Sequence, residues 1–239
     1  MVSYPSMHKP GAGDFEKLYS RFQSPIAAFD CGRKCAPYNE NGVPFCCDLR
    51  HAVPTAYKAE WIYLQENTDL WRRLQGDGNR DLSNLQAEMP AGQVLIACQG
   101  HERCQRSFRS ITCRSFPFFP YINRHNEFLG LSNYWEYEDV CWVISNLQVV
   151  SPVYRNEFIE VYETLFELYP DEIETFAYHS EVMREVFSRK RRTIPLLHKN
   201  GRAYKVTPHN ERMRRVKEAD LPKFGPYKIA QRLPFPGEE

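Results

Sequence analysis

Apolar side chains recur at the spacing of an α-helix near both ends of the chain. Residues 14–23, DFEKLYSRFQ, place four apolar side chains on one face after Asp14, the expected N-cap. A longer stripe begins after Arg155 and consists of Phe158, Tyr162, Leu165, Phe166 and Tyr169. Pro170 interrupts this stripe, and further apolar positions up to Phe187 predict a second helix.

The middle and the end of the chain have the signals of shorter elements. Residues 119–132, FPYINRHNEFLGLS, predict a β-hairpin that turns at Arg124 to Asn126, and residues 194–206 predict another at Asn200-Gly201, which suits a type I′ turn. Before them, the pattern predicts these elements in chain order: a helix capped by Thr55, a short helix over 68–75, an exposed loop over 76–92 and a strand over 93–98.

Charge is distributed unevenly, although the net charge of the whole chain is only +1. Residues 151–183 carry one basic and eight acidic side chains, and residues 184–239 carry 15 basic and six acidic ones. We therefore expect the basic tail to pair with the acidic segment before it, or with an acidic protein partner. The RKRR run at 189–192 lacks the interleaved aromatic residues of a nucleic-acid surface, so a nucleic-acid partner is not expected.

The sequence also indicates the cellular compartment in which we expect the protein. No apolar run approaches the roughly 18 residues that a membrane span requires. The opening residues MVSYPSMHKPGAGDF lack the apolar stretch of a signal peptide. We therefore expect a cytoplasmic protein with no membrane partner.

Eight cysteines stand in the first 141 residues, and none stands in the remaining 98. In a reducing compartment, thiols grouped in this way more often bind metal than form disulfides. For any single cysteine, the alternative is a buried apolar residue that binds nothing. The grouping makes all eight candidate metal ligands: Cys31, Cys35, Cys46, Cys47, Cys98, Cys104, Cys113 and Cys141.

Thiolates are soft ligands, and four of them suffice for one Zn²⁺ ion or one [4Fe–4S] cluster. Arg114 follows Cys113 directly, and its guanidinium is expected to offset thiolate charge through N–H···S hydrogen bonds, with Arg109 nearby in the sequence. The aromatic run that starts at Phe116 is expected to exclude water. A vicinal cysteine pair, many thiols and this aromatic cover favour an iron–sulfur cluster over zinc. His101 is interpreted as a solvated loop residue.

These residues resemble the YkgJ-type cysteine-cluster family, whose C-x-x-C-x-x-C-C pattern is associated with zinc or iron chelation. The resemblance covers about residues 28–145. Its matched positions are the vicinal pair Cys46-Cys47, Thr55 and Glu60 at a helix start, Cys98 and Cys104, and the closing segment Arg109–Phe118, RSITCRSFPF. The chain departs from the pattern in the C-x-x-x-C spacing of Cys31 and Cys35, in the ten residues before Cys46, and in Ser110, where the family has proline.

Taken together, the sequence predicts an α+β protein. Residues 1–150 would form an irregular cysteine-rich metal-binding domain with short helices and hairpins. Residues 151–239 would form a helical segment with a basic C-terminal hairpin and tail. The expected function is chelation of zinc or iron, with an iron–sulfur cluster favoured.

Two alternatives of other classes stay open. The family that the chain resembles includes a flagellin lysine N-methylase, so the resemblance implies a protein-modifying, methyltransferase-like enzyme. In the sequence, no glycine loop for S-adenosylmethionine and no catalytic residue stands out. The other alternative is a zinc-stapled interaction module that uses the basic tail on a partner.

Overall fold

The computed structural model describes residues 9–74, 82–90 and 92–228. The helices are α1 (Ala12–Arg21), α2 (Gly32–Cys35), α3 (Lys58–Asn67), α4 (Ser83–Glu88), α5 (Ile111–Ser115), α6 (Pro152–Leu168) and α7 (Asp171–Arg189). The strands are β1 (Thr55–Tyr57), β2 (Trp71–Arg73), β3 (Gln93–Cys98), β4 (Phe118–Ile122), β5 (Phe128–Asn133), β6 (Ile194–His198), β7 (Ala203–Val206) and β8 (Met213–Val216).

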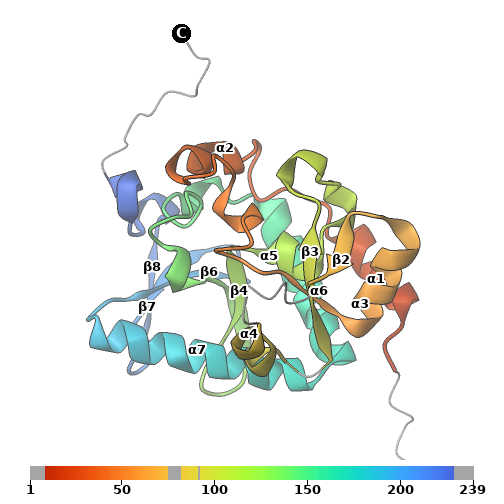
Figure 1. Cartoon of the computed structure of the whole chain (residues 1–239). Helices are drawn as coiled ribbons and strands as arrows, with labels where there is room; N and C mark the ends of the chain where they lie inside the picture. Colours follow the sequence, from red (N-terminus) through yellow and green to blue (C-terminus); the bar gives the residue numbers. More distant parts are fainter. Residues whose placement is uncertain (1–8, 75–81, 91, 229–239) are drawn as a thin grey trace, which may run out of the picture.

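The strands form two antiparallel sheets, so the mixed α+β class is confirmed. The smaller sheet has the order β1-β3-β2, and the larger one has the order β4-β5-β6-β7-β8. In Figure 1, α2 lies at the top of the molecule and α7 runs along the opposite side. Among the described residues, no helix is long and apolar enough to cross a membrane.

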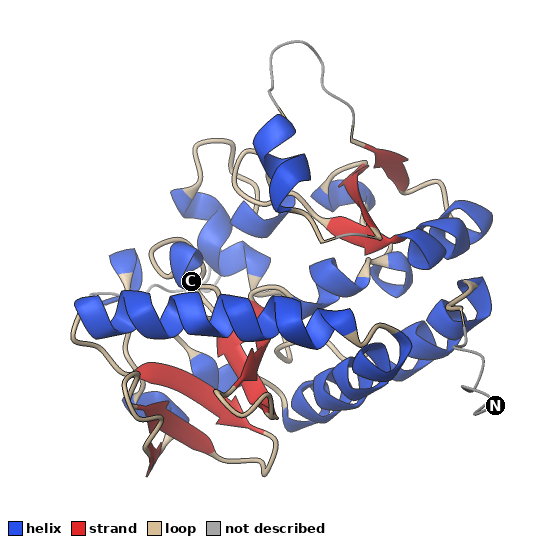
Figure 2. Cartoon of the chain, turned by 90° about the horizontal axis from the view of Figure 1, so that it is seen from below, coloured by secondary structure: helices blue, strands red, loops and turns tan. Residues whose placement is uncertain are grey.

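A single large core lies between the helices and both sheets. The buried stripe of α6 contains Phe158 and Leu165, and it belongs to the same apolar cluster as Phe15 of α1 and Leu64 of α3. A second cluster joins α7 to the larger sheet through Met183 and its neighbours. Figure 2 shows both long helices against the strands of this sheet. The layers follow from the apolar stripes, because each stripe must be covered by another element.

The predicted boundary at residue 150 falls between β5 and β6, which pair with each other in the larger sheet. Gly130 of β5 lies opposite His198 of β6, and Leu131 lies opposite Leu197. The proposed segments 1–150 and 151–239 therefore share one sheet as well as one core.

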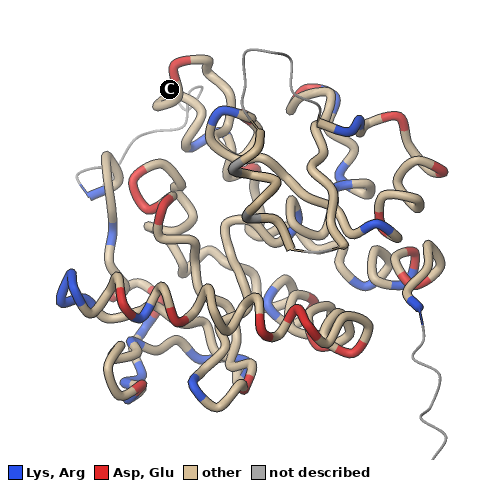
Figure 3. The backbone as a smooth tube through the Cα atoms, turned by 60° about the horizontal axis from the view of Figure 1, so that its bottom comes forward, with Lys and Arg blue, Asp and Glu red and all other residues tan. Residues whose placement is uncertain are grey.

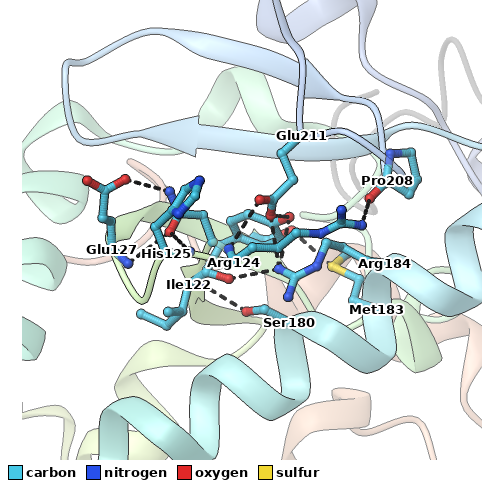
Figure 4. A network of polar contacts seen from close by, with 12 residues as sticks. Ile122, Arg124, His125, Glu127, Ser180, Met183, Arg184, Pro208 and Glu211 are labelled. Carbon is cyan, nitrogen blue, oxygen red and sulfur yellow. Dashed lines mark hydrogen bonds and ion pairs between the residues drawn. The ribbon is translucent and has the colours of Figure 1, made fainter.

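A polar network around the buried ion pair of Arg184 and Glu211 joins α7 to the β4–β5 hairpin and to the turn between β7 and β8 (Figure 4). Arg184 Nη1 lies 3.1 Å from Glu211 Oε1 and donates to the Ile122 carbonyl at 2.9 Å. The backbone N–H of Ile122 in turn donates to Ser180 Oγ at 3.0 Å, and Arg124 N donates to Glu211 Oε2 at 3.1 Å. This network fixes the position of α7 against β4, because two side chains of α7 bind both backbone groups of Ile122.

The longer helices agree with the predicted pattern. Helices α6 and α7 are confirmed, with the break at Pro170. Helix α1 is confirmed as well, but it begins at Ala12, and Asp14 is its third residue. The Asp14 carboxylate accepts a hydrogen bond from Gly11 N at 3.0 Å, so it caps the helix from inside.

Three short elements differ from the prediction. Residues 55–57 form strand β1 before the helix starts at Lys58. The expected helix over 68–75 is wrong, because Trp71–Arg73 pairs with β3 as strand β2. A helix of that length has little stability of its own, so the sheet pairing prevails. Of the expected loop over 76–92, residues 83–88 form α4, whereas 75–81 and 91 lie outside the described residues.

Both predicted hairpins are confirmed, but the second turn is of another kind. Gly201 has a φ of +79°, whereas Asn200 is not in the left-handed region. The Gly201 N–H donates to the His198 carbonyl at 3.0 Å. The loop therefore has three residues, a type I turn followed by a left-handed glycine, in place of a type I′ turn.

The charged segments do not pair in the expected way. In the described part of the chain, the ion pair that joins residues 151–183 to the tail is Arg155 with Glu218, at 3.1 Å, and its polarity is the reverse of the expected one. Within the RKRR run, Arg189 pairs with Glu185 and Arg192 pairs with Glu138. In Figure 3, basic and acidic positions are both spread along the chain.

Candidate metal centre

Five of the eight cysteines line one small cavity of about 30 Å³. They come from two segments that are far apart in sequence, residues 46–47 and residues 98–113. The 3₁₀ turn Phe45–Cys47 carries two of them, the end of β3 and the loop after it carry two more, and α5 carries the fifth. The five residues are Cys46, Cys47, Cys98, Cys104 and Cys113.

Local backbone features hold each stretch against the cavity. Gly100 has a φ of +101°, a conformation that favours glycine, and it turns the chain between Cys98 and Cys104. Ser110 is the N-cap of α5, and its Oγ accepts a hydrogen bond from Cys113 N at 3.2 Å. Ser110 thus starts the helix that carries Cys113.

A cation and a pair of neighbouring sulfurs dominate the electrostatics of the cavity. Arg109 Nε donates to Cys104 Sγ at 3.0 Å. Cys46 Sγ and Cys47 Sγ lie 4.0 Å apart. The contact with Cys46 and then the charge of Arg109 lower the pKa of Cys47 to about 7. Cys47 is therefore the thiol of the cavity that ionises near neutral pH.

The deeper thiols behave differently. Burial raises the pKa of Cys113 to about 12, against the opposing charge of Arg109. Burial also raises the pKa of Cys98. Burial alone would lower the pKa of Arg109, but nearby thiolates, Cys113 and Cys104 foremost, raise it above its ordinary value. Thiolate and guanidinium charges thus stabilise each other at this site.

The three other cysteines form a second group beside the first. Cys31 and Cys35 stand at the two ends of α2, and Cys141 lies in a later loop. Burial raises the pKa of Cys141, and the charges of Cys31 and Cys35 raise it further. Gly32 allows α2 to approach the vicinal pair, because a Cβ there would lie 2.7 Å from Pro44 Cγ.

Arg114 does not take the role that its place in the sequence indicated. Its guanidinium donates to backbone carbonyls, to Arg109 O at 2.8 Å, to Ser107 O at 2.6 Å and to Phe22 O. The same group lies 4.3 Å from the centre of the Tyr19 ring. The N–H···S contact expected of Arg114 comes from Arg109, and Arg114 holds the loop that carries Arg109.

Glu60 is a residue whose importance the sequence pattern shows only in part. Its buried carboxylate accepts hydrogen bonds from Ile111 N at 2.6 Å, from Tyr57 N at 3.1 Å and from the Tyr19 hydroxyl at 2.7 Å. It therefore caps the N-termini of α3 and α5 together, and it fixes the helix that carries Cys113. The match to a family helix start pointed to Glu60, but not to its contact with α5.

The aromatic residues and His101 lie at the edges of the thiol cavity. Phe116 lines a larger, adjoining cavity together with Cys46, Cys113, Tyr134 and Tyr137. Its ring packs edge-on against Tyr137, with centroids 4.7 Å apart. His101 is exposed and also lines the thiol cavity.

All eight cysteines are free thiols in this structure. Among the residues that the structure describes, no three His, Cys, Asp or Glu side chains are grouped as a ready-made metal site. The five thiols are therefore gathered around one cavity without being arranged as a finished ligand set.

Comparison with protein-family models, with curated proteins and with solved structures finds no match to the chain. The resemblance to the cysteine-cluster family therefore stays a prediction from the residues named above.

We predict that Cys47 is the first thiol of the cavity to react in metal-free, reduced protein. Mass spectrometry would follow alkylation by iodoacetamide at pH 7. Arg109→Met should slow the reaction at Cys47, since a pKa rise of one unit from 7 lowers the thiolate fraction at this pH from about one half to about one tenth. The control is Arg103→Met, an exposed arginine on the neighbouring turn. First reaction at Cys46, unaffected by Arg109→Met, would contradict this assignment.

Glu60 gives a second prediction, on stability. Burial raises the pKa of Glu60 to about 7, above its ordinary 4.5, despite its three donors. Between pH 4.5 and pH 7, Glu60 is therefore protonated more in the folded than in the unfolded protein. The stability that Glu60 contributes is present in full below about pH 4.5 and is lost as the pH rises through 7.

Denaturant unfolding at pH 5 and pH 8 would measure this loss. It should amount to about 3 kcal/mol or less for Glu60, because one pKa unit corresponds to about 1.4 kcal/mol. In Glu60→Gln this part of the pH dependence should disappear, whereas Glu66→Gln, an exposed change on the same helix, should retain it. Equal pH dependence in both variants would show that Glu60 is not the group responsible.

Proposed function

We propose that this protein binds a metal through its cysteine cavity, either as an iron–sulfur cluster or as a zinc ion. One observation carries the proposal: thiols from two distant segments, residues 46–47 and 98–113, line a single cavity. A cysteine that only fills a core needs no other thiol beside it. Gathering five of them is the arrangement that a soft metal requires.

The residues of the cavity supply the chemistry that such a metal needs. Four ligands can come from Cys98, Cys104 and Cys113 together with one member of the vicinal pair. The positively charged guanidinium of Arg109 lies beside Cys104 Sγ, and this charge reduces the electrostatic repulsion among several thiolates. A bound metal would cross-link the two segments, and an iron–sulfur cluster would also carry one electron.

The two candidate groups make different demands on the site. A cavity of about 30 Å³ accommodates one ion as it stands. A four-iron cluster needs more room, and the exposed residue Cys46 is the thiol best placed to move, since it borders the larger cavity as well. The aromatic cover from Phe116 and its neighbours favours the cluster, because such cover slows oxidative loss.

The test is the metal and acid-labile sulfide content of protein that is purified without oxygen. Cys113→Ser removes a soft ligand, so it should lose most of the metal that the wild-type protein retains. Cys141→Ser is the matched control, because it makes the same change in the second cysteine group and should retain the metal. Far-ultraviolet circular dichroism would establish that both variants are folded. Full metal content in Cys113→Ser would refute the proposal.

Phe116 separates cluster from zinc in a further experiment. If the metal is an iron–sulfur cluster, Phe116→Ala should bind the cluster initially. The cluster absorbance at about 400 nm should then decay faster in air than in wild-type protein, since water and oxygen reach the sulfurs. The control is Tyr178→Ala, which removes an exposed ring on α7. Colourless protein with bound zinc and no sulfide would rule out the cluster and leave the zinc site.

A further inference from the structure

Two adjoining cavities form a cleft beside the thiol cavity. The first has a volume of about 390 Å³ and is bordered by Cys113 and Phe116. The second has a volume of about 400 Å³ and is bordered by Glu172 and His179. They share four lining residues, Val53, Thr55, Thr112 and Tyr134, so the two cavities lie next to each other. Its size suits a small molecule.

The charge of the cleft has one sign. Glu136 lines the first cavity and Glu172 the second, and among the described residues no Lys or Arg lines either one. Glu172 is only 5% exposed, which makes it an unusual place for a carboxylate. A buried carboxylate without a cation beside it attracts a positively charged ligand.

The Glu172 carboxylate is held in place by neutral donors. Its Oε1 accepts from Gln93 Nε2, and its Oε2 accepts from the Tyr57 hydroxyl, both at 3.1 Å. Each carboxylate oxygen has two acceptor positions, so both can take a further donor. Burial raises the pKa of Glu172, and these two hydrogen bonds oppose the rise. The group is therefore oriented for a ligand that carries N–H donors.

His179 contributes to the same cavity a ring nitrogen without a hydrogen-bond partner among the described residues. Its Nε2 is buried and has no hydrogen-bond partner. Burial lowers the pKa of His179 to about 4, so the ring is neutral at physiological pH. Three rings surround it, with centroid distances of 4.4 Å to Phe119, 4.9 Å to Trp135 and 5.2 Å to Tyr134. An unpartnered buried nitrogen is costly, and a ligand that donates to it removes that cost.

Aromatic faces complete the cleft. Phe116, Tyr134 and Tyr137 line the first cavity, and Tyr162 and Phe176 line the second. The rings of Phe116 and Tyr134 are nearly parallel, at an interplanar angle of 14° and a centroid distance of 6.3 Å. Faces of this kind attract organic cations, and the attraction is stronger where water is excluded.

We infer that this cleft is a binding site for a small organic cation, an amine or ammonium compound, with Glu172 as its counter-charge. An anion would find no basic side chain among the described lining residues, and a purely apolar molecule would leave the Glu172 carboxylate without a counter-charge and the His179 nitrogen without a partner. The inference does not depend on metal at the cysteines, because its charge comes from other residues. The ligand would lie next to Cys113, so the cleft joins a cation site to the proposed metal site.

The test uses three probes of one shape and different charge on the full-length protein at pH 8. They are 4-fluorobenzylammonium, 4-fluorobenzyl alcohol and 4-fluorobenzoate, and ¹⁹F NMR line broadening reports their binding. The cation should bind saturably and at least tenfold more tightly than the alcohol, and the benzoate should not bind. Equal binding of the cation and the alcohol would overturn the inference without any variant.

Two variants test whether the ammonium probe binds in this cleft. Glu172→Gln should weaken binding of the ammonium probe about tenfold and leave binding of the alcohol nearly unchanged. Glu167→Gln, an exposed change on α6, should do neither. Since Glu172→Gln alters buried hydrogen bonds, Tyr134→Leu serves as a second variant, and it should weaken the cation more than the alcohol. Unchanged affinity for the cation in Glu172→Gln or Tyr134→Leu would place the binding elsewhere and refute the assignment.

Discussion

The buried carboxylate of Glu60 is the interaction on which the cysteine cavity depends. It is fully buried, and such a charge is tolerated in a protein only where donors surround it. Its three donors are the backbone of Tyr57, which is the N-cap of α3, the backbone of α5 and the Tyr19 hydroxyl of α1. One side chain thus sets the relative positions of three helices, and the helix that carries Cys113 is among them.

Arg114 extends this support to the loop before α5. It lies over the ring of Tyr19, whose hydroxyl binds Glu60, and it holds the carbonyls of Ser107 and Arg109. The loop is thereby positioned so that Arg109 reaches Cys104. One half of the thiol cavity therefore rests on a buried polar network. The other half carries exposed Cys46 on a short 3₁₀ turn, and Asp48 just after that turn has a buried carboxylate that accepts hydrogen bonds from Asn39 and Arg50.

The sequence predicted those features whose cause is local. Helices α6 and α7 have long apolar stripes, and the hairpin of β4 and β5 has its turn residues in place, so each is encoded within its own segment. Strand β2 was missed because its structure comes from pairing with β3, about 25 residues later. The grouping of cysteines was visible in the spacing, but their division into five and three depends on how α2 packs on Pro44.

Roles that depend on distant contacts could not be read from neighbouring residues. Arg114 stands beside Cys113 in sequence, yet its donors go to carbonyls, and Arg109 supplies the contact to sulfur. The cleft between Cys113 and Glu172 joins parts of the chain that only the fold brings together, as the hydrogen bond from Tyr57 to Glu172 illustrates. Hydrogen-bonding capacity is visible in a sequence, but the partner that uses it is not.

We propose that the cysteine cavity holds a metal on sulfur ligands, and X-ray absorption at the K edge of the metal in wild-type protein, purified without oxygen, can identify those ligands. We expect a first shell dominated by sulfur, at about 2.3 Å for either iron or zinc. A first shell of nitrogen and oxygen, or protein that is folded and free of metal, would refute the proposal.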